Sequence, residues 1–355
     1  MYLLGFDKKR VGIFFEKSYK ILRHKMNRKL VRNIINIICF CGLIWFALYL
    51  HENRVYKFNK TALIMDTFVE VRIETKSPVG ETIISDVFDL MRDYEQKLDY
   101  YNPDSSISKV NGQKESEMFS ELYEMLQIAA KLYDQTDKRY DLTIGELAEL
   151  WKVEKVPSEQ ALQQALKTTG FDLLEYDETK IIKPEAVKLN LGSIAKGFII
   201  DRAIEYVRKY QVKSAIINAG GDLRIIGYDE TVSIGVQHPR AVDGELLARL
   251  EVGNVSLVTS GDYERFFEED GVRYHHLLDA VTGFPARENV SVSVIAATAT
   301  MADAYATAFF VMPADKALKL AEETAGIELF LVKMEKDKLI TMSSSGMKKY
   351  IKEVF

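Results

Sequence analysis

The segment LNLGSIAKGFIIDRA, residues 189–203, reads as a short strand that turns directly into a helix. Gly192 and Gly197 would let the backbone approach a ligand closely, and the free N–H groups at the start of a helix favour phosphate. Lys196 would add a positive charge to such a site. The same letters also fit an ordinary strand–turn–helix with a solvated lysine, because neither a Walker A nor a G-x-G-x-x-G pattern is present.

Strands and helices alternate irregularly on both sides of this segment. Periodicity predicts helices at 82–98, 117–134, 158–168, 301–312 and 314–325. Strands are expected at 62–75, 187–192, 214–227, 232–237, 246–261, 274–279, 289–299 and 328–334. Because no regular βαβ order appears, we expect an α+β fold rather than a doubly wound parallel sheet.

The N-terminal part of the chain predicts a membrane anchor. Residues 33–50 (NIINIICFCGLIWFALYL) carry no charge, and this length is near the short end for a helix that crosses a bilayer. Residues 1–32 hold ten Lys or Arg against two acidic residues. A basic arm before an apolar helix predicts a cytoplasmic N-terminus, with residues 51–355 on the extracytoplasmic side of the cell membrane.

Two alternatives to an uncleaved anchor start from the same letters. A cleaved signal peptide would need a site such as A-x-A after the apolar run, and none follows it. A lipoprotein signal would need small residues beside Cys39 or Cys41, where bulky ones stand. We therefore expect one retained transmembrane helix.

Composition limits the chemistry of the body. The chain has a net charge of −5 although residues 1–32 contribute +8, which leaves −13 for the remainder and argues against nucleic acid as a partner. Both cysteines lie in the apolar run, and no H-E-x-x-H motif is present, so the body has neither a disulfide nor a thiolate metal site. Any metal would be held mainly by oxygen, which favours Mg²⁺ or Ca²⁺.

Three further segments carry polar groups in suggestive patterns. AGGD (219–222) places paired glycines inside an apolar strand, which indicates either a β-bulge or a close-packed ligand. The adjacent His275 and His276 would point to opposite faces of a strand, so at most one could act as a general base near Asp279. In TMADAYATAFF (300–310), Asp303 and Thr307 could grip one hard cation from the same helical face, although Thr300-x-x-Asp303 also fits a capping box.

Taken together, these segments resemble the ApbE family, the FAD:protein FMN transferases, over about residues 60–345. The matching segments in order are LIMDTFVEV (63–71), YYNPDSSISKVN (100–111), RYDLTIGELAELW (139–151), LNLGSIAKGFIIDRA, IINAGGDLRIIG (216–227), TSGDYERFF (259–267), YHHLLDAVTG (274–283) and TMADAYATAFF. The resemblance implies mixed sheets packed with helices around an FAD-binding cleft. It also implies Mg²⁺-dependent transfer of FMN from FAD to a Thr or Ser hydroxyl of an acceptor protein, with AMP released.

The resemblance also implies roles for individual residues. Those expected along the FAD are Met65, Tyr101, Tyr140, Asp141, Asn190, Lys196 and His276. Those expected at Mg²⁺ are Ser193 and Ala306 through their carbonyls, and Asp303 and Thr307 through their side chains. His276 is the candidate general base, and Asp303 is the second catalytic residue. The acceptor is expected to be an extracytoplasmic electron-transfer protein with a flavinylation motif.

The sequence departs from the family pattern at two of these places. Asn190 stands where the family usually has Asp, which removes a charge near the nucleotide, and Ala280 stands where it usually has Pro. The segment Asp279–Gly283 resembles part of the acceptor motif itself. Because Phe284 follows where a small residue is expected, we do not expect self-modification at Thr282.

Three other functions share these features in part. An Mg²⁺-dependent FAD pyrophosphatase would use the same metal and base with water as the nucleophile. A non-catalytic FAD-binding module would bind flavin without turnover. A purely structural anchored domain would bind no flavin at all.

Overall fold

The computed structural model describes residues 28–52, 54–210, 212–241, 244–336 and 338–355. The chain divides into two compact units, one ending at Val55 and a body of Tyr56–Phe355. The expected basic arm lies outside the described residues, except for residues 28–32.

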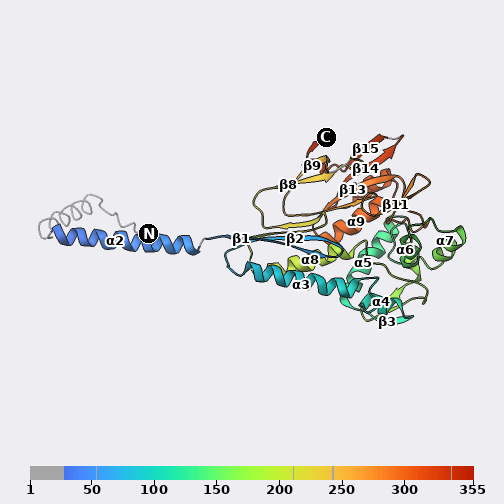
Figure 1. Ribbon diagram of the computed structural model, residues 1–355, viewed down its shortest axis with the longest axis horizontal. Helices are drawn as coiled ribbons and strands as arrows, with labels where there is room; N and C mark the ends of the chain where they lie inside the picture. Colours follow the sequence, from blue (N-terminus) through green and yellow to red (C-terminus); the bar gives the residue numbers. More distant parts are fainter. Residues whose placement is uncertain (1–27, 53, 211, 242–243, 337) are drawn as a thin grey trace, which may run out of the picture. The chain divides into compact units, whose positions relative to one another are not determined.

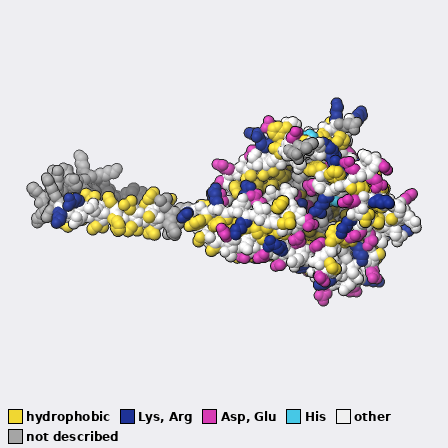
Figure 2. Space-filling view, in the orientation of Figure 1, with side chains coloured by type: hydrophobic (Ala, Val, Ile, Leu, Met, Phe, Trp, Pro, Cys, Tyr) yellow, Lys and Arg dark blue, Asp and Glu magenta, His cyan; other side chains and the backbone are white. Residues whose placement is uncertain are grey.

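The first unit contains the helix α2 (Arg28–Glu52), which includes the apolar run. Lys29–Tyr49 is long and apolar enough to cross a membrane. A signal sequence near an N-terminus has the same length and apolar character. Figure 2 shows hydrophobic side chains along the length of this helix. The part of α2 with described burial is almost wholly exposed, as expected for a surface that requires an apolar environment.

The body is built on an eight-stranded sheet in which every pairing is antiparallel. Its strands, in spatial order, are β1 (Tyr56–Ile64), β2 (Thr67–Thr75), β6 (Ser214–Ala219), β7 (Asp222–Ile226), β10 (Ser256–Gly261), β13 (Asn289–Ala296), β14 (Glu328–Glu335) and β15 (Lys338–Ser343). All residues of β13 are buried, because both faces of the sheet are covered. The expected α+β class is confirmed.

Helices cover one face of this sheet and a small sheet covers the other (Figure 1). The helices are α3 (Gly80–Leu98), α8 (Ala195–Arg208), α9 (Ala299–Val311) and α10 (Ala314–Glu323). The small sheet has the order β16 (Ile351–Val354), β9 (Leu246–Val252) and β8 (Val232–Gln237). Side chains alternate between the two layers: Ile216 and Ile225 face the small sheet, whereas Ala215 and Ile217 face the helices.

Shorter elements complete the body. The remaining helices are α4 (Ser106–Asn111), α5 (Ser120–Gln135), α6 (Gly145–Lys152) and α7 (Glu159–Leu166), with single 3₁₀ turns at Phe171–Leu173 and Met347–Lys349. The remaining strands are β3 (Glu115–Glu117), β4 (Glu175–Tyr176) and β5 (Lys180–Ile182) in one sheet, and β11 (Phe266–Glu269) and β12 (Val272–His275) in another.

The expected helices all form, but several expected strands are divided. The run 62–75 is a hairpin whose turn residues, Met65 and Asp66, both have φ of 55°. Most non-glycine residues avoid this backbone region, so nothing in the letters marks the turn. The runs 214–227 and 246–261 each contain two strands, and only the end of 272–275 falls within the expected strand at 274–279. The run 187–192 forms no strand; Lys188 makes one isolated bridge to Ile144.

Candidate active site

The start of α8 is reached through a tight turn that begins at Asn190. The N–H of Asn190 donates to the carbonyl of Leu142 at 2.7 Å, and its side-chain oxygen accepts from the N–H of Gly192 at 2.9 Å. These bonds hold the backbone in a turn where a strand was expected. Asn190, Ser193 and Lys196 are all half-buried, so each keeps surface that a ligand can contact.

Lys196 forms an ion pair with the buried Asp222 of β7, with 2.7 Å between Nζ and Oδ2. Asp222 follows the turn Gly220–Gly221 that joins β6 to β7, so the AGGD segment is a hairpin turn and not a bulge. Burial lowers the pKa of Lys196, but the carboxylates of Asp222 and Asp303 raise it more, so the net shift is upward. The lysine therefore stays positively charged.

Asp303 lies on α9 and faces α8. Its Oδ2 accepts the N–H of Gly197 at 2.9 Å. A Cβ at position 197 would lie 2.2 Å from the carbonyl oxygen of Ala299, so the two helices can approach this closely only at a glycine. The alternative capping box does not form, because Thr298 is the N-cap of α9 and Thr300 lies inside the first turn, where its hydroxyl donates to Asp201 at 2.6 Å.

The positive charge near Asp303 is too weak to keep the pKa of its carboxyl group at the ordinary value. Burial, with the charge of Asp222 adding to it and that of Lys196 opposing it, raises the pKa of Asp303 to about 7. The described residues donate one hydrogen bond to Oδ2 and none to Oδ1. A cation bound at Oδ1 would therefore favour the ionised form.

The residues around Asp303 fit a hard divalent cation. Thr307 lies one helical turn further along α9 and is half-buried, so its hydroxyl can share a ligand with Asp303. With the carbonyls of Ser193 and Ala306, the donor set would consist of oxygen alone, as Mg²⁺ prefers. Among the described residues, no three His, Cys, Asp or Glu side chains are placed to hold a metal, so a site here needs hydroxyl and carbonyl oxygens.

Tyr140 connects the turn before α8 to this carboxylate. It is buried, and its Oη accepts a hydrogen bond from the hydroxyl of Ser193 at 3.1 Å. Burial raises the pKa of Tyr140 above its ordinary value, and the charge of Asp303 adds to the shift. Tyr140, Ser193 and Asp303 therefore belong to one site.

Asp141 lies beside Tyr140 but has a different task. Its Oδ1 accepts the N–H of Thr143 at 2.7 Å, and its Oδ2 accepts the N–H of Phe171 at 2.9 Å. Burial raises the pKa of Asp141 to about 6, although these bonds oppose the shift. Both oxygens thus hold two loops together, which positions Tyr140 for the site.

The two adjacent histidines lie in different environments, one buried and one exposed, with β12 ending at the first of them. His275 is buried, with Nε2 2.7 Å from the carbonyl oxygen of Ala286 and Nδ1 accepting the N–H of Leu277 at 3.2 Å. His276 is exposed and uses Nδ1 to contact the carbonyl oxygen of Arg265 at 3.3 Å. His275 is a structural residue, and only His276 can reach a ligand.

His276 is neutral at physiological pH. Although His276 keeps exposed surface, desolvation by the protein packed around it lowers its pKa to about 4; the bond to the Arg265 carbonyl opposes this shift, and the charge of Lys196 adds to it. The tautomer that donates from Nδ1 to Arg265 leaves the lone pair of Nε2 free. This is the form that a general base requires.

Met65 and Tyr101 lie on separate elements at the border of this group. The N–H of Met65 donates to Glu95 at 2.8 Å, which fixes the β1–β2 turn. That turn lies beside the AGGD turn, since a Cβ at Gly220 would lie 2.3 Å from the hydroxyl oxygen of Thr67. Tyr101 is half exposed, and the ammonium of Lys152 lies 3.5 Å from its ring centroid. Within the described part of the chain, no hydrogen bond, ion pair or ring contact joins either residue to Lys196 or Asp303.

Two acidic residues of the site were not anticipated from sequence. Asp222 is the ion-pair partner of Lys196. Glu264 keeps exposed surface, but desolvation by the surrounding protein raises its pKa to about 7, and the charge of Lys196 opposes this shift. Each comes from a strand or loop far from α8 in the chain. Only the AGGD segment itself could have drawn attention to Asp222.

The Asp279–Gly283 segment forms a tight turn rather than a flexible loop. Asp279 is buried, pairs with Arg139 and accepts the N–H of Val281 at 2.9 Å. The carbonyl of Gly283 accepts from the indole of Trp151 at 2.8 Å. Ala280 therefore stands in a well-held turn even without the usual proline, and Thr282 is exposed on it.

Comparison with known proteins places the chain among flavin transferases. A model described as the ApbE family matches residues 65–331. A FAD:protein FMN transferase of Treponema pallidum is 31% identical over 308 residues, covering 79% of this chain and 85% of the relative. One of Klebsiella pneumoniae is 30% identical over 301 residues, covering 82% and 93%.

Solved structures agree with the sequence relatives. The crystal structure of the ApbE protein from Thermotoga maritima superposes with a TM-score of 0.77 at 31% identity, covering 84% of this chain and all of that one. The apo form of the flavinyl transferase ApbE from Pseudomonas stutzeri gives a TM-score of 0.74 at 27% identity, covering 83% and 96%.

Proposed function

The chain belongs to the ApbE family, and from that premise we propose that it transfers FMN from FAD to a threonine or serine hydroxyl of an acceptor protein, releasing AMP. One observation carries the proposal: the charge of one lysine acts on the pKa of both a buried carboxylate and a neutral histidine. These are Asp303, Lys196 and His276.

FAD would lie across the segments that form this site. The residues proposed along it are Met65, Tyr101, Tyr140, Asn190, Lys196 and His276, with Asp141 acting through the loops that it holds. Lys196 suits the diphosphate, because its charge persists at any physiological pH. The half-exposed ring of Tyr101 offers a stacking surface for an aromatic ring.

Mg²⁺ would be held by the side chains of Asp303 and Thr307 and the carbonyl of Ser193, with the carbonyl of Ala306 as a further donor. When bound there, it would offset the negative charge of the diphosphate and of the transition state. The raised pKa of Asp303 supports this assignment, since the carboxylate needs a cation to remain ionised near neutral pH.

The protein's own groups then account for the transfer. The acceptor oxygen forms a bond to the phosphorus next to the ribityl chain, and the bond from that phosphorus to the bridging oxygen breaks, so AMP leaves. His276 takes the hydroxyl proton at Nε2 while the Arg265 carbonyl holds its Nδ1–H. Lys196 stabilises the charge that develops on the phosphoryl oxygens.

We also propose that the body works outside the cytoplasm. The domains would be a cytoplasmic arm (1–32), one transmembrane helix (33–50) and an extracytoplasmic transferase domain (51–355). The apolar helix and the positive charges before it support this orientation. The acceptor would then be an extracytoplasmic electron-transfer protein.

Incubation of the purified chain with FAD, Mg²⁺ and candidate acceptor domains tests the transfer. We expect in-gel flavin fluorescence on the acceptor, and its loss when the acceptor Thr or Ser is replaced by Ala. A second candidate, FAD hydrolysis, is favoured by the exposure of His276, which leaves the base open to water. Free FMN and AMP with an unlabelled acceptor would support hydrolysis instead.

A flavin-binding module without turnover makes a different prediction. It would bind FAD and consume none, in the presence or absence of Mg²⁺ and acceptor. Asp303→Ala would then lower flavin affinity and alter no rate.

A further inference from the structure

We propose that Asp201 is a positioning residue for the metal-binding face of α9, acting through the first turn of that helix. This inference rests on the proposed function, because it assigns Asp303 and Thr307 to a cation. Among the described residues, the side chain of Asp201 makes no hydrogen bond or ion pair with those proposed at the cation or along the FAD.

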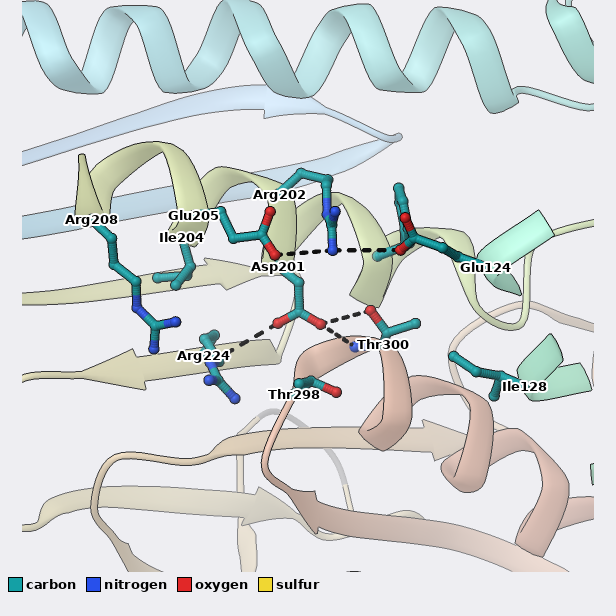
Figure 3. A pocket seen from close by; sticks show the side chains of 11 residues that line it. Glu124, Ile128, Asp201, Arg202, Ile204, Glu205, Arg208, Arg224, Thr298 and Thr300 are labelled. Atoms are coloured by element: carbon teal, nitrogen blue, oxygen red, sulfur yellow. Dashed lines mark hydrogen bonds and ion pairs between the residues drawn. The ribbon is translucent and has the colours of Figure 1, made fainter. Parts of the chain in front are cut away.

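Asp201 holds the start of α9 from the neighbouring helix α8 (Figure 3). Its Oδ1 accepts the N–H of Ala299 at 2.9 Å, and its Oδ2 accepts both the N–H of Thr300 at 2.8 Å and the Thr300 hydroxyl at 2.6 Å. These are N–H groups that a helix cannot satisfy internally. A buried carboxylate at this end also complements the helix dipole.

A second connection lies one helical turn away on each helix. Gly197, four residues before Asp201, donates its N–H to Asp303, four residues after Ala299. The pairs 197–303 and 201–299 thus fix both the register and the spacing of α8 and α9. One turn is about 5.4 Å of rise, so a shift at the first turn of α9 is passed directly to Asp303.

A hydrogen bond to a metal-binding carboxylate orients it and influences metal affinity. The Gly197 N–H donates such a bond to Asp303, and the bond can form only while α9 lies at its present distance from α8. Asp201 contributes to that distance by binding the first turn of α9 from α8. Its effect on the cation would therefore be geometric, and it would extend from Asp303 to Thr307 because both lie on α9.

The pocket beside Asp201 could instead be a ligand site, since its volume is about 210 Å³ and three arginines line it. Two of these arginines, however, are paired within the protein. Arg202 contacts Glu205 at 3.0 Å and Glu124 at 3.7 Å, and the buried Arg224 lies 4.0 Å from Asp201. Both oxygens of Asp201 are likewise engaged by the start of α9, which favours the positioning role over a ligand site.

Thr298 provides a matched control on the same helix. It is the N-cap of α9, and its hydroxyl accepts the N–H of Met301 at 3.3 Å. Thr298→Ala weakens the same helix end but leaves every bond between α8 and α9 in place. Asp201→Asn keeps the shape of the side chain and turns one of its acceptors into a donor that faces an N–H.

The experiment is a titration of full-length wild type, Asp201→Asn and Thr298→Ala with Mg²⁺ in the presence of FAD, followed by calorimetry, together with the melting temperature of each. We expect both variants to lower the melting temperature, and Asp201→Asn alone to weaken Mg²⁺ binding by about tenfold or more. Equal Mg²⁺ affinity in all three proteins would overturn the proposal.

Two further arms keep the result interpretable. If Asp201→Asn does not fold, Thr300→Val removes one of its three hydrogen bonds, and a smaller loss of Mg²⁺ affinity is expected; an unchanged affinity would count against the proposal. A wild-type protein that binds Mg²⁺ but labels no acceptor would refute the transferase function, whereas the positioning role would still be decided by the titration.

Discussion

At position 276 an imidazole stays neutral while a lysine close enough to influence it keeps its charge. The lysine is stabilised by Asp222, and the histidine is held through Nδ1 by a backbone carbonyl. At one pH, a general base must be unprotonated and a phosphate-binding lysine must be protonated. The local environment of each group provides them.

His276→Gln should slow FMN transfer and leave FAD binding largely intact. Glutamine keeps a polar side chain of similar length but cannot accept a proton. The expected loss in kcat is on the order of 10²–10⁴-fold. Stopped-flow transfer assays and FAD titrations would measure the two effects separately, and His275→Gln is the comparison, expected to lower stability because that ring is buried.

Mg²⁺ affinity should fall as the pH is lowered from 8 to 6. Because the pKa of Asp303 is raised to about 7, protons compete with the cation in this range. Below pH 7 the apparent affinity should decrease by about tenfold per pH unit. Calorimetric titrations at several pH values would show this, whereas Asp303→Asn should bind weakly at every pH. An affinity that does not change with pH would contradict the assigned pKa.

The sequence allowed some site residues to be identified without the structure, and others not. Strand geometry predicts opposite faces for His275 and His276; in the structure His275 is buried and His276 is exposed, although β12 ends at His275. The partnership of Lys196 with Asp222 could not be predicted, because it depends on which strands lie beside α8. The family resemblance implies that Asp141 lies along the FAD. The sequence does not reveal that both of its oxygens accept backbone N–H groups, because these come from the turn after it and from a distant loop.

At the scale of elements, the contact between α8 and α9 matters most. Eleven of the thirteen residues of α9 are buried, so the helix is surrounded by protein on nearly all sides. Such a helix is fixed by its neighbours rather than by one amphipathic face. Asp303 and Thr307 owe their position to this packing.

Gly197→Ala should disrupt the site by separating the two helices. Its Cβ would meet the Ala299 carbonyl at 2.2 Å, a clash that only a backbone shift can relieve. Overpacking of this kind costs about 1–3 kcal/mol of unfolding free energy. Chemical denaturation would measure the loss, and Mg²⁺ binding should weaken with it. Gly253→Ala, where a Cβ would meet nothing within 4 Å, should leave both unchanged.

Helices were predicted more accurately than strands, for a physical reason. The helix at 82–98 is marked by its apolar face, and α3 covers Gly80–Leu98. Each of the runs 62–75 and 214–227 is expected to be one strand but forms a hairpin, because Met65–Asp66 is not a usual turn pair and Gly220–Gly221 also fits a bulge. A two-residue turn keeps the strand period nearly intact, so periodicity does not reveal it.

At the scale of the whole molecule, the apolar helix and the body are separate compact units. The sheet, both of its covering layers and all site residues lie in Tyr56–Phe355. The chemistry proposed here therefore needs none of residues 1–55. Their role would be to determine where the body acts.

Removal of residues 1–55 should release a body that folds and transfers FMN. We expect the truncated protein to remain in solution without detergent and to label a soluble acceptor domain at the rate of the full chain. Size-exclusion chromatography and in-gel fluorescence would test this. In membranes, by contrast, only the full chain should sediment with the lipid fraction. A truncated body that unfolds would show that the first unit contributes to its stability.

The central claim is that one site, containing Asp303, Lys196 and His276, moves FMN onto a protein hydroxyl. Intact mass spectrometry of an acceptor domain, after incubation with FAD, Mg²⁺ and either wild type or Asp303→Asn, tests it most directly. The account predicts that wild type adds one FMN through a phosphoester to a Thr or Ser of the acceptor, and that the variant adds none. An acceptor modified equally by both proteins, or by neither while FAD is consumed, would contradict it.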